Sequence, residues 1–202
     1  MFFDEKFFGI DYAEVVTMCN LKKGDVFIDA GSNLGQEIEY FKDLGITLDS
    51  YEPHPYFFEK IKKEYGNLEN VTLNNKAVWI KNQRKNFFFK KDPAAWGDNH
   101  SSGGASLIKE KANLQGTFGC ESECVDIADI IQKHDHIKVL KIDVEGAEYH
   151  LLRRLISKDL INKPEFIFFE DHSRKVNSEE FRENKQFVQN YVDLTGIKFY
   201  NW

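Results

Sequence analysis

The stretch GDVFIDAGSNLGQEIEYFKDLGITLDSYE, residues 24–52, reads as a strand, a helix and a second strand. Residues 25–30 form a short apolar run that Gly31 ends, and residues 34–44 carry apolar side chains at helical spacing. Residues 46–52 form a second strand-like run. Two strands joined by a helix make a parallel pair with a right-handed crossover, so this stretch predicts an α/β fold.

The same alternation continues along the chain. We expect further helices at residues 56–65, 127–133, 147–157 and 178–193, and further strands at residues 71–80, 86–90, 121–125, 137–143, 165–170 and 197–200. This order predicts a mostly parallel central sheet flanked by helices. No linker or internal repeat divides the chain, so we expect one domain over residues 1–202, with an N-terminal helical extension at 1–23 and an inserted strand and loop region at 86–125.

Composition and charge argue against several classes of protein. The chain is 42% hydrophobic and 30% charged, which favours a packed core over disorder. Its net charge is −6 without a long basic run, so we expect no binding to nucleic acid through phosphates. The N-terminal residues lack the pattern of a signal peptide, and no stretch approaches the ~20 apolar residues of a membrane span. We therefore expect a cytoplasmic protein without a membrane partner, and the oligomeric state stays open.

Three cysteines, Cys19, Cys120 and Cys124, do not make a disulfide framework. Cys120 and Cys124 lie in a strand-like segment, where their spacing places both on one face. They have no matching His or Cys pair elsewhere, so we expect no zinc site and reduced, structural cysteines.

Acidic residues stand at the expected carboxyl ends of three strands: Asp29, Glu52 and Asp143. Open parallel sheets bind ligands just beyond these ends, near the point where the strand order reverses. A carboxylate at Glu52 can accept hydrogen bonds from both ribose hydroxyls of a nucleoside. The turn after Asp29 lacks the G-x-G-x-x-G pattern, which favours a nucleoside ligand without phosphate over a dinucleotide. The alternative is that Asp29 merely caps a helix and Glu52 is an exposed strand end.

Glycines and residues beside the strand ends complete the expected ligand site. Gly31 lets the chain turn sharply and lets a ligand lie against the backbone, and Gly35 lets the next helix pack close to the sheet. Pro53 or His54 would lie beside the face of an adenine ring, and residues 75–77 would lie near its edge.

Five motifs occur in order along the chain: VFIDAGSNLGQ, SYEPHP, NNKAVW, GGASLI and VLKIDVEGAEYHLL. Over about residues 24–172 they resemble the FkbM family of S-adenosylmethionine-dependent methyltransferases, most specifically in KIDVEGAE, residues 141–148. The resemblance implies a Rossmann-like class I methyltransferase fold and methyl transfer, typically to a hydroxyl on a sugar, a glycan or a natural product. On the motifs and the strand ends together, we expect the cofactor-binding residues to be Asp29, Gly31, Ser32, Asn33, Gly35, Gln36, Glu52, Pro53, Asn75, Ala77 and Asp143.

The end of the chain departs from the family pattern. Such folds usually finish with an antiparallel strand pair, whereas only one helix and one strand are expected after Glu170. We therefore expect that the last strand is lost or that the inserted region supplies it.

A sugar hydroxyl is a poor nucleophile at neutral pH, so it needs a general base or a metal ion that lowers its pKa. The candidate catalytic residues follow the ends of two adjacent strands and are Asp143, Glu145, Glu170 and His172, with Asp143 the first choice. Glu145 and Glu148 have an alternative role at a helix N-terminus, where carboxylates are favourable, and for Glu148 we prefer that role. Carboxylates and one His could hold Mg²⁺, but no ligand spacing requires it, so we assign no metal ligand.

Lys141 is unusual in an apolar strand and requires a partner, which is either a neighbouring carboxylate or solvent. The loop at residues 92–106 is rich in Gly, Ser, Asn and Asp, and we expect it to close over a small-molecule or glycan acceptor. Trp96 in this loop would stack on a sugar ring or anchor the loop. The competing hypotheses are an NAD-dependent oxidoreductase and a non-catalytic nucleoside-binding module on the same fold.

Overall fold

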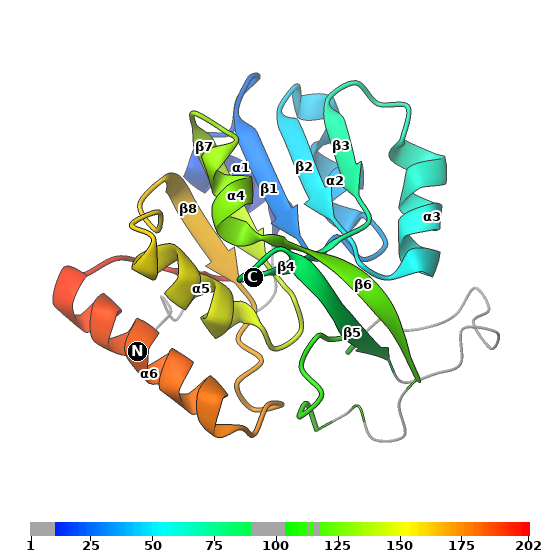
Figure 1. Ribbon diagram of the computed structural model, residues 1–202. Helices are drawn as coiled ribbons and strands as arrows, with labels where there is room; N and C mark the ends of the chain where they lie inside the picture. Colours follow the sequence, from blue (N-terminus) through cyan, green and yellow to red (C-terminus); the bar gives the residue numbers. More distant parts are fainter. Residues whose placement is uncertain (1–10, 90–103, 113, 115–117) are drawn as a thin grey trace.

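The central sheet is built from short apolar strands that are buried on both faces, as is typical of parallel strands covered by helices. A computed structural model describes residues 11–89, 104–112, 114 and 118–202 (Figure 1). Its six-stranded sheet has the order β3 (Val71–Asn74), β2 (Thr47–Tyr51), β1 (Val26–Ala30), β7 (Ile137–Ile142), β8 (Pro164–Phe169) and β9 (Tyr200–Asn201). Every neighbouring pair in this sheet is parallel.

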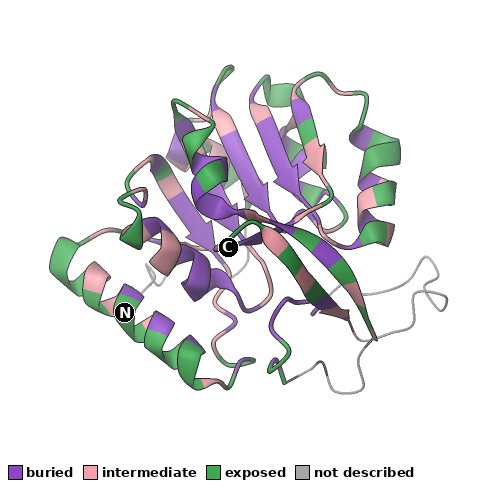
Figure 2. Cartoon of the chain, viewed as in Figure 1, coloured by how far each residue is buried: buried purple, intermediate pink, exposed green. Residues whose placement is uncertain are grey.

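Helices cover both faces of the sheet. Because successive side chains of a strand point to opposite faces, neighbouring strand residues belong to different cores. Phe27 belongs to the core that includes side chains of α1 (Tyr12–Cys19), α2 (Gln36–Phe41) and α3 (Pro55–Tyr65). Its neighbour Ile28 belongs to the core on the other face, with α4 (Ile127–Gln132), α5 (Glu148–Ser157) and α6 (Glu179–Thr195). Figure 2 shows the buried strands between helices whose outer faces are exposed. The predicted α/β fold, with a mostly parallel sheet flanked by helices, is confirmed.

A second, smaller sheet lies next to the carboxyl ends of the central strands (Figure 1). Its order is β4 (Ala77–Trp79), β6 (Phe118–Asp126) and β5 (Gln83–Phe89), with β4 parallel and β5 antiparallel to β6. A bridge between Phe88 and Ser106 ties the chain after residue 103 to β5. In the parts of the chain that the structure describes, no helix is long and apolar enough to cross a membrane.

The prediction of a single strand at residues 71–80 is wrong. The structure divides this segment into β3 and β4, which belong to different sheets. The Asn74 side-chain amide donates to Asp49 Oδ1 at 2.8 Å, and the Asn75 amide donates to the Glu52 carbonyl at 2.8 Å. These bonds fasten the turn to β2 and its end, so the chain changes direction before Ala77.

The predicted helix at residues 34–44 is shorter than expected. It begins at Gln36, because Gly35 adopts a left-handed conformation (φ 79°), and a 3₁₀ turn, η1 (Lys42–Leu44), follows it. Leu34 and Leu44, two of the apolar residues behind this prediction, are therefore exposed.

The two ends of the chain are only partly as expected. In the N-terminal extension the structure describes α1, and residues 1–10 lie outside the described residues. One of our two expectations is that the inserted region supplies the last strand of the central sheet. Its described strands do not, because β5 and β6 pair with each other and β6 pairs with β4. The described edge of the central sheet is instead β9, which runs parallel to β8 through two residue pairs.

Candidate active site

The first turn of the fold meets the end of β7 at the point where the strand order reverses. Gly31 follows β1 with a φ of 101°, and a Cβ atom on it would lie 1.8 Å from the backbone oxygen of Asp143. The Asp143 backbone N–H donates to the Ala30 carbonyl at 2.9 Å, which continues the pairing of β1 with β7. Only glycine therefore fits this position without movement of the backbone.

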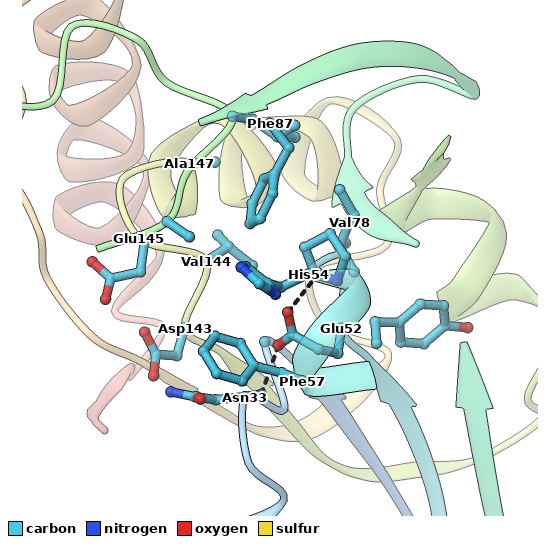
Figure 3. Close-up of a pocket in the computed structure, with 16 residues that line it drawn as sticks. Asn33, Glu52, His54, Phe57, Val78, Phe87, Asp143, Val144, Glu145 and Ala147 are labelled. Carbon is cyan, nitrogen blue, oxygen red and sulfur yellow. Dashed lines mark hydrogen bonds between the residues drawn. The ribbon is translucent and has the colours of Figure 1, made fainter. Parts of the chain in front are cut away.

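A cleft opens beside this contact, between the carboxyl ends of β1, β2 and β7 and the smaller sheet (Figure 3). Parallel sheets bind ligands at this place. Six of the predicted cofactor-binding residues line it: Gly31, Asn33, Glu52, Pro53, Ala77 and Asp143. The predicted catalytic residue Glu145 lines it too. The residues chosen from separate strand ends therefore meet in one cleft.

Two backbone N–H groups hold the carboxylate of Glu52 in the cleft. Its Oε2 accepts from the Asn33 backbone N–H at 2.7 Å, and its Oε1 accepts from the His54 backbone N–H at 2.8 Å. Burial raises the pKa of Glu52 to about 8, although these two N–H groups and Lys141 lower it. Each carboxylate oxygen can accept more than one hydrogen bond, so both retain capacity for a ligand.

The other predicted cofactor-binding residues lie outside the cleft lining. Asp29 and Ser32 are fully buried beneath it, and the Ser32 N–H donates to the Tyr51 carbonyl at 3.1 Å. Gly35 faces α3, where an added Cβ would lie 2.9 Å from a ring carbon of Tyr65. Gln36 is exposed on α2, and Asn75 is exposed with its amide turned to the Glu52 carbonyl. These five residues can support the site but do not line it.

Lys141 joins the turn to the sheet beneath it. Its ammonium lies 3.0 Å from Asp29 and 3.5 Å from Glu37, and it donates to the Gly31 carbonyl at 2.7 Å. Burial lowers its pKa, but Asp29, Glu37 and Asp143 outweigh burial and raise it. The expected carboxylate partner is confirmed, and Asp29 acts on the turn through this lysine.

Asp143 is the carboxylate with the clearest capacity for a reacting group. Its Oδ1 atom is buried and has no hydrogen-bond partner among the described residues, and its Oδ2 lies 3.8 Å from the Lys141 ammonium. The pKa of Asp143 is raised to about 7. Burial is the largest cause, the charge of Lys141 lowers the pKa, and the charge of Glu170 raises it. A carboxylate whose pKa lies near neutral pH is well matched to accept a proton from a hydroxyl.

Three carboxylates surround the ring of His172, which is 1% exposed. Nδ1 lies 3.0 Å from Glu148, and Nε2 lies 3.1 Å from Glu145 and 3.2 Å from Glu170. Burial lowers the pKa of His172, but the three carboxylates outweigh burial and raise it to about 12. A charged imidazolium has no lone pair for a proton, so His172 in this state is not a general base.

Glu148 makes two kinds of contact, one at the start of α5 and one with His172. It accepts from the Gly146 N–H at 2.9 Å at the start of α5, which confirms its preferred role at the helix N-terminus. It also holds His172, a contact between residues 24 apart in the chain. Sequence reasoning missed this second contact.

Glu145 fastens the segment after residue 103 to the end of β7. Its backbone has a left-handed φ of 57°, and its side chain accepts from the Gly104 N–H at 3.0 Å and pairs with the buried ammonium of Lys111. Ser106 Oγ donates to the Glu145 carbonyl at 2.7 Å. Burial raises the pKa of Glu145, but His172 and Lys111 lower it to about 2. A carboxylate engaged in this way is poorly suited to act as a base.

Sequence reasoning also missed the apolar wall of the cleft and the buried lysine. Phe57, Phe87 and Leu107 form part of the wall, and the sequence patterns placed the first two only within a predicted helix and a predicted strand. Lys111 follows no predicted strand, and only its nearness to the GGASLI motif pointed to it. Residues 92–103 of the predicted acceptor loop, with Trp96, lie outside the described residues.

Comparison with known proteins gave one match that covers most of the chain. The family model described as the Methyltransferase FkbM domain matches residues 29–193, which include Asp29 near the end of β1, all of β7 and β8, and the carboxylates of Asp143 and Glu170 that follow those two strands. A search of curated proteins found no match.

Proposed function

Because the chain belongs to the FkbM methyltransferase family, we propose that it transfers a methyl group from S-adenosylmethionine to a hydroxyl oxygen of a sugar, a glycan or a natural product. One observation carries the proposal beyond the family. The carboxylates of Glu52 and Asp143 line one cleft with the Gly31 turn between their strands, at the place where parallel sheets bind nucleosides.

The charge of the cleft supports S-adenosylmethionine over a dinucleotide. Among the described residues the lining contains three carboxylates, Glu52, Asp143 and Glu145, and neither Lys nor Arg. S-adenosylmethionine carries a positive sulfonium and an ammonium group, whereas NAD carries a negative pyrophosphate that needs N–H donors or cations. The NAD-dependent alternative therefore has neither the family match nor the electrostatics in its favour.

The shape of the cleft also suits this cofactor. Glu52 would accept the ribose hydroxyls, and Ala77 and Val78 supply an apolar surface for the adenine ring. Gly31 leaves the backbone of the turn uncovered by a side chain, so a ligand can lie against it.

When bound, S-adenosylmethionine supplies a methyl group on a positively charged sulfur, which an oxygen nucleophile can displace. Asp143 would accept the proton of the acceptor hydroxyl on a carboxylate oxygen, because burial raises its pKa to about 7. A general base typically contributes about 10²–10⁴-fold to the rate. Glu145 would hold residues 104–111 beside the cleft, where Ala105 and Leu107 help to exclude water.

Binding and transfer test the proposal separately. Calorimetry should show that S-adenosylhomocysteine binds the wild-type chain and that Glu52→Ala weakens binding by about 10–100-fold, because bonds to a carboxylate are lost. The control Glu39→Ala removes an exposed carboxylate from α2 and should change nothing. Labelled S-adenosylmethionine with oligosaccharides and cell extracts would then identify the acceptor.

Three results would contradict this function. If neither S-adenosylmethionine nor S-adenosylhomocysteine binds, methyl transfer from S-adenosylmethionine is excluded. A thermal shift with NADH but not with S-adenosylhomocysteine would support an oxidoreductase. Binding without transfer to any acceptor in the extracts would support the non-catalytic module.

A further inference from the structure

Carboxylates crowd around one imidazole where β7 and β8 end and α5 begins. The ligand atoms of Asp143, Glu170 and His172 all lie within 4.8 Å of one another. Ligands on opposite sides of one divalent ion are about 4–5 Å apart, so these three atoms can surround a single ion. Glu145 is adjacent, because its Oε2 lies 3.1 Å from His172 Nε2.

Two buried atoms of this group have no hydrogen bond within the described parts of the chain. They are Nε2 of His172, on a side chain that is 1% exposed, and Oδ1 of Asp143. Nε2 is close to Glu145 and Glu170, but neither contact has the geometry of a hydrogen bond. An unsatisfied polar atom in a buried place commonly marks the position of an absent ligand or ion.

The other ring nitrogen shows how His172 is oriented. Nδ1 lies 3.0 Å from Glu148, which is fully buried and is fixed by the Gly146 N–H. Metal-binding histidines characteristically donate one ring N–H to a carboxylate, so that the other nitrogen faces the ion. Glu148 therefore presents Nε2 to the space between Asp143 and Glu170, where a bound cation would displace the Nε2 proton of the imidazolium into solvent.

The charge of this space also favours a cation. Lys111 pairs with Glu145, and Lys141 lies 3.8 Å from Asp143 but closer to Asp29, at 3.0 Å. Lys175 also acts on Glu170, and the carboxylates still outnumber the three lysines; they are those of Asp143, Glu145, Glu148 and Glu170.

We propose that Asp143, Glu170 and His172 bind a divalent cation of the Mg²⁺ or Mn²⁺ class, with Glu145 available as a further oxygen ligand and Glu148 orienting the histidine. Oxygen ligands in the majority, with one imidazole and no nearby cysteine, suit this class better than Zn²⁺. The site is open to its ion, because the Glu170 side chain is 43% exposed.

The position of the site gives the cation a use. Asp143 belongs both to the cation site and to the cleft lining, so the ion would lie where an acceptor hydroxyl must approach. A bound divalent cation lowers the pKa of a hydroxyl that it coordinates. This use rests on the proposed methyl transfer, whereas binding of the cation does not.

Binding of Mn²⁺ to the chelator-treated 202-residue chain tests the site, with loss of the spin-resonance signal of free Mn²⁺ as the readout. The wild-type chain should bind Mn²⁺ at one site, and Glu170→Gln should weaken binding at least tenfold. Glu165→Gln is the matched control, since the Glu165 side chain is 42% exposed and lies near the start of β8, whereas Glu170 follows its end. Circular dichroism would verify that both variants fold.

Absence of binding at millimolar Mn²⁺, or equal affinity of Glu170→Gln and Glu165→Gln, would overturn the cation site. In that case His172 simply neutralises its carboxylates as an imidazolium. Calorimetry with S-adenosylhomocysteine separates the two proposals. Cofactor binding without Mn²⁺ binding would refute only the cation site, and Mn²⁺ binding without cofactor binding would refute only the proposed function.

Discussion

The affinity of the cleft for S-adenosylhomocysteine should rise with pH, and Glu52 should be the cause. The pKa of this carboxyl is raised to about 8. Burial is the largest cause, the charge of Asp29 also raises the pKa, and the charge of Lys141 lowers it. Ribose hydroxyls donate best to an ionised carboxylate. The ligand therefore favours the deprotonated form, and binding below about pH 8 should release a proton.

The size of the effect follows from the fraction of Glu52 that is ionised. With a pKa of about 8, roughly one carboxyl in a hundred is ionised at pH 6 and about half at pH 8. If only the ionised form binds, affinity rises by about two orders of magnitude between pH 6 and pH 9, or about 3 kcal/mol.

Isothermal titration calorimetry from pH 6 to pH 9, in two buffers with different ionisation enthalpies, measures both the affinity and the released proton. Glu52→Gln is the control, because an amide does not titrate and any remaining change belongs to the ligand or to other groups. The reasoning is refuted if the wild-type affinity changes less than about threefold, or if the glutamine variant shows the same rise.

Three substitutions test the framework of the site. Gly31→Ala should lower the free energy of unfolding by at least about 3 kcal/mol, through left-handed strain and a clash with the Asp143 carbonyl. Gly24→Ala, where φ is also positive but no atom lies within 4 Å, should cost only about 1–2 kcal/mol in the same urea titration. Lys141→Met should cost about 3–5 kcal/mol, because buried carboxylates lose their partner, whereas Lys138→Met on the same strand should cost under about 1 kcal/mol. Asp143→Asn should reduce methyl transfer by about 10²–10⁴-fold and leave cofactor affinity within about tenfold, and transfer at the wild-type rate would remove Asp143 from the mechanism.

Stability should also depend on Glu52. A folded-state pKa raised to about 8 means that its contribution is complete below the unfolded value near 4.5 and is lost as pH rises through 8. The melting temperature of the ligand-free wild-type chain should therefore fall between pH 6 and pH 9 more steeply than that of Glu52→Gln. Parallel curves for the two chains would show that Glu52 is already ionised in the folded state.

The sequence alone determined the elements that depend on local patterns. The apolar runs of β1, β2, β7 and β8 were predicted within one or two residues, because strands buried on both faces carry a continuous apolar signal. Because these strand boundaries were predicted, the residues at the carboxyl ends of the strands could be named from the sequence. The structure places Gly31, Glu52 and Asp143 in the lining of one cleft.

Only the tertiary structure decided the contacts that join distant parts of the chain. Lys111 meets Glu145 across 34 residues, and His172 meets Glu148 across 24, through loops whose course no local pattern specifies. The division of residues 71–80 between two sheets likewise depends on bonds to β2 and its end that a propensity for strand cannot show. The strand pattern therefore located three residues of the cleft. The partners around His172 depend on strand order and packing, which bring distant residues together without a signal in the local sequence.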